Sequence, residues 1–183
     1  MRTLRARLCW LLVLCGLTAG SVWAAVTYSF FESSTRWIDE RGETVTLAKW
    51  QGRPLIVSMG YANCRRTCAT TTLVFKRIQK VLDAKGKQVD FLMFSFDEKS
   101  TPEDWAEFRR NRGLDRPNWH FLIGKSQHDA STMAHMIGIN YWFDPGHNSY
   151  LHDFRIQLLG EDGRIRAEID WDRMDEEDIA RLF

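Results

Sequence analysis

Two cysteines lie four positions apart in the stretch GYANCRRTCATTT, which covers residues 60–72. In a helix, residues four positions apart face the same side, so Cys64 and Cys68 can direct their sulfurs toward one point. Such a pair can form a short disulfide, exchange electrons with another thiol, or bind a metal ion. Arg65 and Arg66 favour the thiolate form, which both thiol exchange and metal binding require.

A purely structural disulfide is the least favoured of the three interpretations. Closing so short a loop stabilises a protein by only about 2 kcal/mol, and a chain of 183 residues can build a core without it. A closed zinc site would need a second pair of ligands of the same kind. Two thiolates with one imidazole suit copper instead, because thiolate sulfur prefers Cu(I) and the imidazole also allows Cu(II). The redox and copper interpretations both stay open at this point.

The first 24 residues resemble an export leader. Arg2, Arg5 and Arg7 precede an apolar stretch, and small residues permit cleavage after Ala24. The uncharged run 8–26 is also long enough to remain as a membrane anchor, although cleavage is favoured. Either outcome predicts a domain in the periplasm or at the outer face of the inner membrane. After residue 24, Cys64 and Cys68 are the remaining cysteines, and their compartment is oxidising.

The charge balance gives no sign of nucleic-acid binding. Without the three leader arginines, 25 − 3 = 22 basic residues stand against 24 acidic ones. A balance near −2 predicts neither a nucleic-acid partner nor attraction to an anionic membrane surface.

The hydrophobic pattern predicts one α/β domain with a central mixed sheet. Continuous apolar runs indicate buried strands, and Thr101 with Pro102 and Asp104 indicates a helix start. An antiparallel hairpin surrounds the turn EDG, and residues 25–35 form a tether before the domain at 36–183. The predicted strands are 43–48, 54–60, 89–96, 119–123, 153–159 and 164–170, and the predicted helices lie at 68–85, from Thr101, at 126–138 and at 175–183.

Ligand sites in sheets with a parallel centre lie beyond the carboxyl ends of the strands, which is where Gly60–Cys68 falls. Among the histidines, His152 is the best candidate ligand because it directly precedes the predicted strand 153–159. His147, in the loop after the sequence DPG, is the second candidate. We expect His120 to be a partly buried strand residue and His128 to be exposed. The set of Met133, His135 and Met136 has the spacing of ordinary core packing on a helix.

Three segments in order resemble the Sco/SenC family of thioredoxin-like copper proteins. They are GYANCRRTC, SFDEKSTPEDW and HDFRIQLLGEDGRI. The last places His152 eleven residues before Gly163 of the hairpin turn. The resemblance runs from about residue 36 to the end of the chain. Ala69 and Arg65 stand where the family usually has proline, and Glu98 stands where proline often follows the aspartate.

The resemblance implies a thioredoxin-like fold in which Cys64, Cys68 and His152 bind one copper ion, as Cu(I) or Cu(II). Asp97 would lie near the site without binding the metal. The protein would then act as a copper chaperone rather than an enzyme. Its partner would be the copper subunit of cytochrome c oxidase, or another exported protein that accepts copper or carries thiols. The alternative is a thiol–disulfide oxidoreductase, in which Cys64 attacks and Cys68 resolves the mixed disulfide.

Overall fold

The structure is a computed structural model that describes residues 28–62 and 67–183, with the backbone alone for residues 67–69. The predicted leader, the possible anchor at 8–26, Cys64 and both arginines of the motif lie outside the described residues. Within the described part, no helix is long and apolar enough to cross a membrane.

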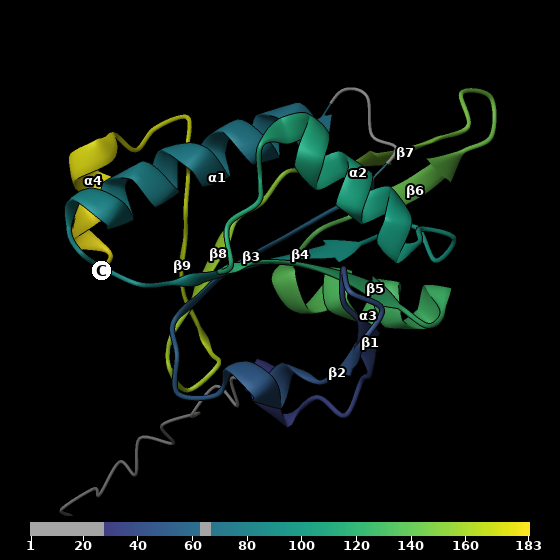
Figure 1. Cartoon of the computed structure of the whole chain (residues 1–183), viewed down its shortest axis with the longest axis horizontal. Coiled ribbons are helices and arrows are strands. Elements are labelled where there is room, and N and C mark those ends of the chain that lie inside the picture. The colour runs from purple at the N-terminus through teal and green to yellow at the C-terminus, as the bar shows by residue number, and fades with distance from the viewer. Residues whose placement is uncertain (1–27, 63–66) are drawn as a thin grey trace, which may run out of the picture.

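The described residues form an α/β domain whose helices lie on both sides of a sheet (Figure 1). In chain order the elements are η1 Phe30–Glu32, β1 Trp37–Ile38, β2 Thr44–Val45, η2 Leu47–Trp50, β3 Leu55–Gly60, α1 Thr67–Ala84, β4 Asp90–Ser95, α2 Pro102–Arg112, β5 Trp119–Gly124, α3 Gln127–Ile137, β6 Tyr141–Asp144, β7 Ser149–His152, β8 Gln157–Leu159, β9 Ile165–Glu168 and α4 Glu176–Arg181, where η marks a 3-10 helix.

The described strands form a seven-stranded sheet in the order β2-β1-β5-β4-β3-β8-β9, and a separate two-stranded sheet of β6 and β7. Strands β3, β4 and β5 are parallel. The predicted hairpin β8–β9 joins β3 in antiparallel orientation. A second antiparallel edge is formed by β1 and β2 beside β5. The sequence predicts a strand at β2 but none at β1, because a strand of two residues is too short to show a period.

The central strands are buried on both faces, as their continuous apolar runs predict. Every residue of β3 and β4 is buried. Helices α1 and α2 cover one face, where Phe75 of α1 packs on Phe91 and Trp105 of α2 packs on Phe121. Helix α3 covers the other face (Figure 1). Burial on both sides explains why these strands lack the alternating pattern of a half-exposed sheet.

The start of α2 is confirmed in detail. The Thr101 side chain accepts a bond from the Asp104 N–H, and the Asp104 carboxylate accepts one from the Thr101 N–H. Pro102 occupies the first helical position, where its missing N–H costs nothing. The helix buries Trp105 and Phe108 on its inner face.

The strand predicted at 43–48 is shorter than expected. Strand β2 covers only Thr44 and Val45, and the chain then turns into the 3-10 helix η2. Leu47 and Trp50 lie three positions apart and are both buried. A helix with three residues per turn places such a pair on one side, whereas a strand would direct one of them to solvent.

The segment predicted as a tether is part of the folded domain from residue 29. Phe30 and Phe31 are 3% and 8% exposed. The Ser29 hydroxyl donates to the Asp162 carbonyl at 2.6 Å, and the Phe30 N–H donates to the Gly163 carbonyl at 2.9 Å. Burial of two aromatic side chains and the bonds to the β8–β9 turn order this segment, so the predicted boundary at residue 36 is too late.

Candidate metal centre

The described part of the cysteine motif lies at the carboxyl end of the central strand β3. Gly60 ends this strand, and Cys68 is the second residue of α1. The first turn of a helix carries unpaired N–H groups and a positive dipole end, which stabilise a thiolate. The prediction that Cys68 stands at a helix start is confirmed. Cys64, the other predicted sulfur ligand, lies outside the described residues.

His152 lies at the end of a strand that was not predicted. It is the last residue of β7 and stands opposite Tyr141 of β6. The strand predicted at 153–159 begins only at Gln157, so His152 belongs to the separate β6–β7 hairpin. The signal for this hairpin is the run of aromatic residues in YWFDPGHNSY, with Asn148 at a positive φ of 44° in the turn.

One nitrogen of His152 is buried without a hydrogen-bond partner. The Nδ1 atom donates to the main-chain carbonyl of Asp153 at 2.7 Å. A carbonyl can only accept, so in the neutral imidazole the ring proton lies on Nδ1 and Nε2 keeps its lone pair. Among the described residues, Nε2 has no partner although it is buried. An imidazole nitrogen prepared in this way fits a metal ligand, because an unsatisfied buried acceptor is otherwise costly.

Phe96 holds the imidazole from the side of the main sheet. It directly follows β4 and is fully buried, and its ring centroid lies 4.6 Å from that of His152. The rings of Tyr141 and Tyr150 lie at 4.7 and 6.3 Å from the same phenylalanine. Sequence reasoning did not identify Phe96, although it stands beside Asp97 at the end of a predicted strand. The contact places His152 at the carboxyl edge of the parallel strands.

Tyr61 links the start of the cysteine segment to the histidine hairpin. It follows β3 directly, and its hydroxyl accepts a bond of 3.4 Å from the Tyr150 N–H. The two rings also make an edge contact at 5.3 Å. Tyr150 is two positions before His152 on β7. The segment that leads to Cys64 and the strand that carries His152 are therefore neighbours in space.

Tyr150, two positions before His152, is held in its neutral form. Partial burial raises the pKa of Tyr150 to about 12, and the nearby carboxylate of Asp97 adds to the shift. Both causes disfavour a phenolate, the first by desolvation and the second by repulsion between like charges. Tyr150 therefore contributes a neutral hydroxyl and ring at neutral pH.

Asp97, the predicted neighbour of the site, directly follows Phe96 after the end of β4 and makes its hydrogen bonds within its own loop. Its carboxylate accepts a bond from the Lys99 N–H at 2.9 Å, and its own N–H donates to the Ser95 hydroxyl at 3.1 Å. In the described part, the imidazole of His152 makes its ring contact with Phe96 and its hydrogen bond with Asp153. Asp97 acts on this region through its charge, as its effect on Tyr150 indicates.

His147, the second candidate, lies at the turn of the β6–β7 hairpin, whereas His152 ends the hairpin at its base. The His147 side chain is 81% exposed. The Nδ1 atom is 2.6 Å from the Asp144 carboxylate, and this bond lowers the pKa of Asp144. Exposure and a committed carboxylate partner make His147 a poorer metal ligand than His152.

The remaining histidines have the surroundings that the sequence predicts. His120 is partly buried, with Nε2 at 3.1 Å from the Asp90 carboxylate, and His128 is exposed. Met133 is buried in the core and Met136 packs partly against it, as expected for the helical set, while His135 is exposed. Among the described residues, His, Cys, Asp and Glu form no cluster of three that could hold a metal ion.

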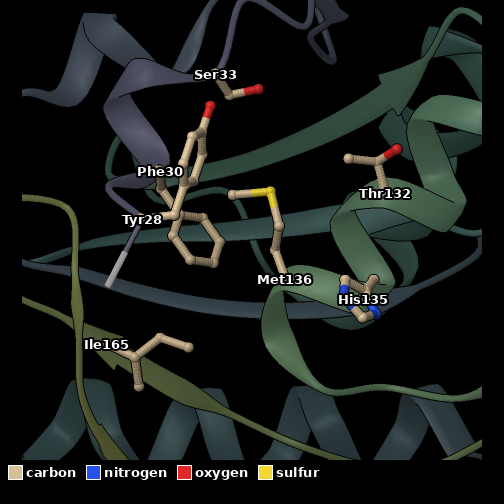
Figure 2. A pocket seen from close by; sticks show the side chains of 7 residues that line it. All are labelled: Tyr28, Phe30, Ser33, Thr132, His135, Met136 and Ile165. Carbon is tan, nitrogen blue, oxygen red and sulfur yellow. The ribbon is translucent and has the colours of Figure 1, made fainter. Parts of the chain in front are cut away.

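An apolar groove of about 530 Å³ lies elsewhere, between η1, α3 and β9 (Figure 2). None of the candidate ligands in the described part of the chain lines it. Its lining residues are Tyr28, Phe30, Ser33, Thr132, His135, Met136 and Ile165.

Fold and site together define a class, the thioredoxin-like domains that carry a cysteine at a helix start and a histidine at the same edge of the sheet. Residues 29–182 match the SCO1/SenC family, and the protein belongs to this family. The SCO1 protein homolog of Bacillus subtilis (strain 168) is 28% identical over 129 residues, which cover 69% of this chain and 67% of the homolog.

Two solved structures show the same fold. BsSco, a member of the Sco family of cytochrome c oxidase assembly proteins in which a disulfide switch was identified, has a TM-score of 0.70 at 23% identity, with 86% of this chain and 92% of that chain covered. ScoI of Bradyrhizobium japonicum, solved with copper bound, has a TM-score of 0.68 at 22% identity, with 81% and 94% covered. These likenesses confirm the predicted thioredoxin-like fold.

Proposed function

We propose that this protein is an exported copper chaperone in which Cys64, Cys68 and His152 bind one copper ion. The observation that carries the proposal is the buried Nε2 of His152, which has a lone pair and no partner among the described residues. Copper bound to a family member supports the choice of metal. Thiolate and imidazole are also the ligands that copper prefers in its two common oxidation states.

The copper ion is the cargo of this protein, and the residues of the chain prepare its capture and release. Cys68 at the start of α1 is favoured as a thiolate by the helix dipole. The Nδ1 proton of His152 is held by the Asp153 carbonyl, which leaves the lone pair of Nε2 free to bind the metal ion. We propose as acceptor the copper subunit of cytochrome c oxidase or another exported protein with copper ligands, in keeping with the description of BsSco as a member of a family of assembly proteins.

Anaerobic copper titration of the reduced full chain tests the proposal. The wild-type chain should bind one equivalent. Cys64→Ala, Cys68→Ala and His152→Ala should each lower the affinity by more than about 100-fold, the upper end of what loss of a merely supporting residue costs. His147→Ala is the matched control from the same hairpin and should bind as the wild type does. An unchanged visible spectrum of Cu(II)-loaded His152→Ala would exclude the three-ligand site.

A thiol–disulfide oxidoreductase is the second candidate, favoured by the position of Cys68 at a helix start. The Cys64 thiolate would attack a substrate disulfide and release one substrate thiolate. The Cys68 thiolate would then displace the second, which leaves a Cys64–Cys68 disulfide and a substrate that has gained two electrons. The reduction potential of the Cys64–Cys68 disulfide tests the oxidoreductase role. A value far below about −270 mV, that of thioredoxin, with no exchange in either direction, would exclude the role.

The leader and the location belong to the same proposal. We expect export directed by residues 1–24, with cleavage after Ala24 or retention of the run 8–26 as an anchor. Sequencing the N-terminus of the protein recovered from cells distinguishes the two outcomes. A chain that remains in the cytoplasm would exclude export.

A further inference from the structure

The base of the β6–β7 hairpin is closed by a clamp between Asn140 and Asp153. The Asp153 N–H donates to the Asn140 carbonyl at 2.9 Å. In return, the Asn140 main-chain N–H and side-chain amide donate to the same Asp153 carboxylate oxygen at 3.2 and 2.7 Å. This pair follows directly on the facing pair of Tyr141 and His152. The clamp therefore adjoins the candidate ligand.

The clamp fixes the carbonyl group that receives the His152 proton. The main-chain N–H and the carboxylate of Asp153 are both held by Asn140, and its carbonyl accepts from Nδ1 of His152 at 2.7 Å. With two of its polar groups held, the residue has little freedom to turn its carbonyl away. The direction of this carbonyl determines which imidazole nitrogen carries the proton.

The other side of the imidazole is held by packing. The Phe96 ring lies 4.6 Å from the His152 ring at an interplanar angle of 45°. Phe96 restricts rotation of the imidazole, but a hydrocarbon ring cannot choose between the two tautomers. Within the described part of the chain, that choice rests on the Asp153 carbonyl.

We propose that Asn140 and Asp153 are positioning residues that set the tautomer of His152 and direct its Nε2 toward the metal ion. Neither residue is a ligand. The inference rests on the proposed function for the identity of His152 as a copper ligand. The tautomer itself is a property of the metal-free protein and is measured without copper.

Long-range 1H–15N spectra of the histidine rings provide the first test. They are recorded on the reduced, metal-free full chain at about pH 8, above the ordinary histidine pKa of about 6.5. His152 in the wild type should carry its proton on Nδ1 alone. Asn140→Ala and Asp153→Ala should show a mixture with the Nε2–H tautomer. Asp153→Asn keeps a side-chain oxygen as acceptor and should restore the wild-type spectrum.

A matched control comes from the turn end of the same hairpin. The Asp144 carboxylate accepts bonds from the Gly146 N–H at 2.9 Å and from His147, but it does not adjoin His152. Asp144→Ala should leave the His152 spectrum unchanged. Circular dichroism and the midpoint of urea unfolding establish that each variant is folded. Should Asp153→Ala unfold, Asn140→Ala carries the test, because it keeps the Asp153 main chain.

Copper binding provides the second test. Asn140→Ala and Asp153→Ala should weaken Cu(II) binding by about 10-fold, the low end of the range for residues that orient a ligand. Asp153→Asn should recover the affinity. A wild-type Nε2–H tautomer, or folded alanine variants with an unchanged Nδ1–H tautomer, would overturn the inference. A tautomer that shifts as expected in a chain that binds no copper would refute the proposed function and still support the clamp.

Discussion

The hairpins β8–β9 and β6–β7 differ in what holds them in place. Strand β8 pairs with β3 of the main sheet, with Leu159 opposite Leu55, and all three of its residues are buried. In the described part of the chain, β6 and β7 pair only with each other. Their residues Trp142 and Phe143 are exposed large side chains. The β8–β9 hairpin is held by the pairing of β8 with the core strand β3, whereas the β6–β7 hairpin is held by contacts along one side and at its ends.

The hairpin with fewer contacts to the core is the one that carries the candidate metal ligand. The β6–β7 hairpin depends on ring contacts with Phe96 and Tyr61, and on the Tyr141 hydroxyl, which lies 2.9 Å from that of Ser131. It nevertheless carries His152. Elements that bind and release a ligand are drawn from the less stable parts of a fold, because they must be able to change.

The largest expected effect comes from the same substitution made in the segment bonded to the β8–β9 turn and in the β6–β7 hairpin. Phe30→Ala should lower the free energy of unfolding by about 3 kcal/mol, because a buried ring is lost. Phe143→Ala should cost only about 1 kcal/mol, since this ring is 48% exposed and its aromatic contact is with Tyr150 at 5.2 Å. Urea unfolding followed by tryptophan fluorescence measures both. Equal losses would show that the segment bonded to the β8–β9 turn and the β6–β7 hairpin do not differ in this way.

A smaller effect is expected at the turns. Gly163 has a φ of 73°, and an added Cβ would lie 2.6 Å from Cδ2 of Phe31. Gly163→Ala should therefore cost about 2 kcal/mol through backbone strain and crowding. Gly146→Ala, at the turn of the other hairpin, brings its Cβ to 3.2 Å from an Asp144 oxygen and should cost within about 0.5 kcal/mol. Thermal or urea unfolding of the two variants measures both losses in stability. A loss for Gly146→Ala as large as that for Gly163→Ala would contradict the comparison.

The smallest effect concerns alkaline pH. The pKa of Tyr150 is raised in the folded protein to about 12 from its ordinary value of 10.0, so the stability linked to its neutral form is present below pH 10. It is lost as the pH rises from 10 to about 12, because the unfolded chain releases this proton first. Tyr150→Phe should flatten the pH dependence of urea unfolding across this range in the metal-free chain. An equal slope in both proteins would show that Tyr150 is not the group responsible.

The parts that the sequence predicts well are those where burial or capping leaves one solution. Strands β3 and β4 follow from their continuous apolar runs, and α2 follows from Thr101, Pro102 and Asp104. The β8–β9 hairpin was recognised by its alternation around the turn EDG. In each case a local pattern agrees with the tertiary environment.

The β6–β7 hairpin was missed because its burial does not alternate. The four residues of β6 are intermediate, exposed, exposed and intermediate in exposure. Without a buried face there is no period of two to detect. The sequence predicts His152 as a ligand from its place before a strand at 153–159, whereas in the structure it is the last residue of β7. Its orphaned Nε2 and its contact with Phe96 depend on tertiary packing that no spacing reveals.

The contact between the start of the domain and the β8–β9 turn has a consequence for the order of folding. Ser29 bonds to a carbonyl 133 positions further along the chain, and β3 obtains its partner β8 only when residue 159 is present. Contacts so distant in sequence form late and slowly. If the chain is exported as proposed and its N-terminal part crosses the membrane first, it cannot complete its sheet until residue 159 has also crossed. Under the proposed export, this topology would keep the chain open during translocation and delay closure of the sheet until the far side is reached.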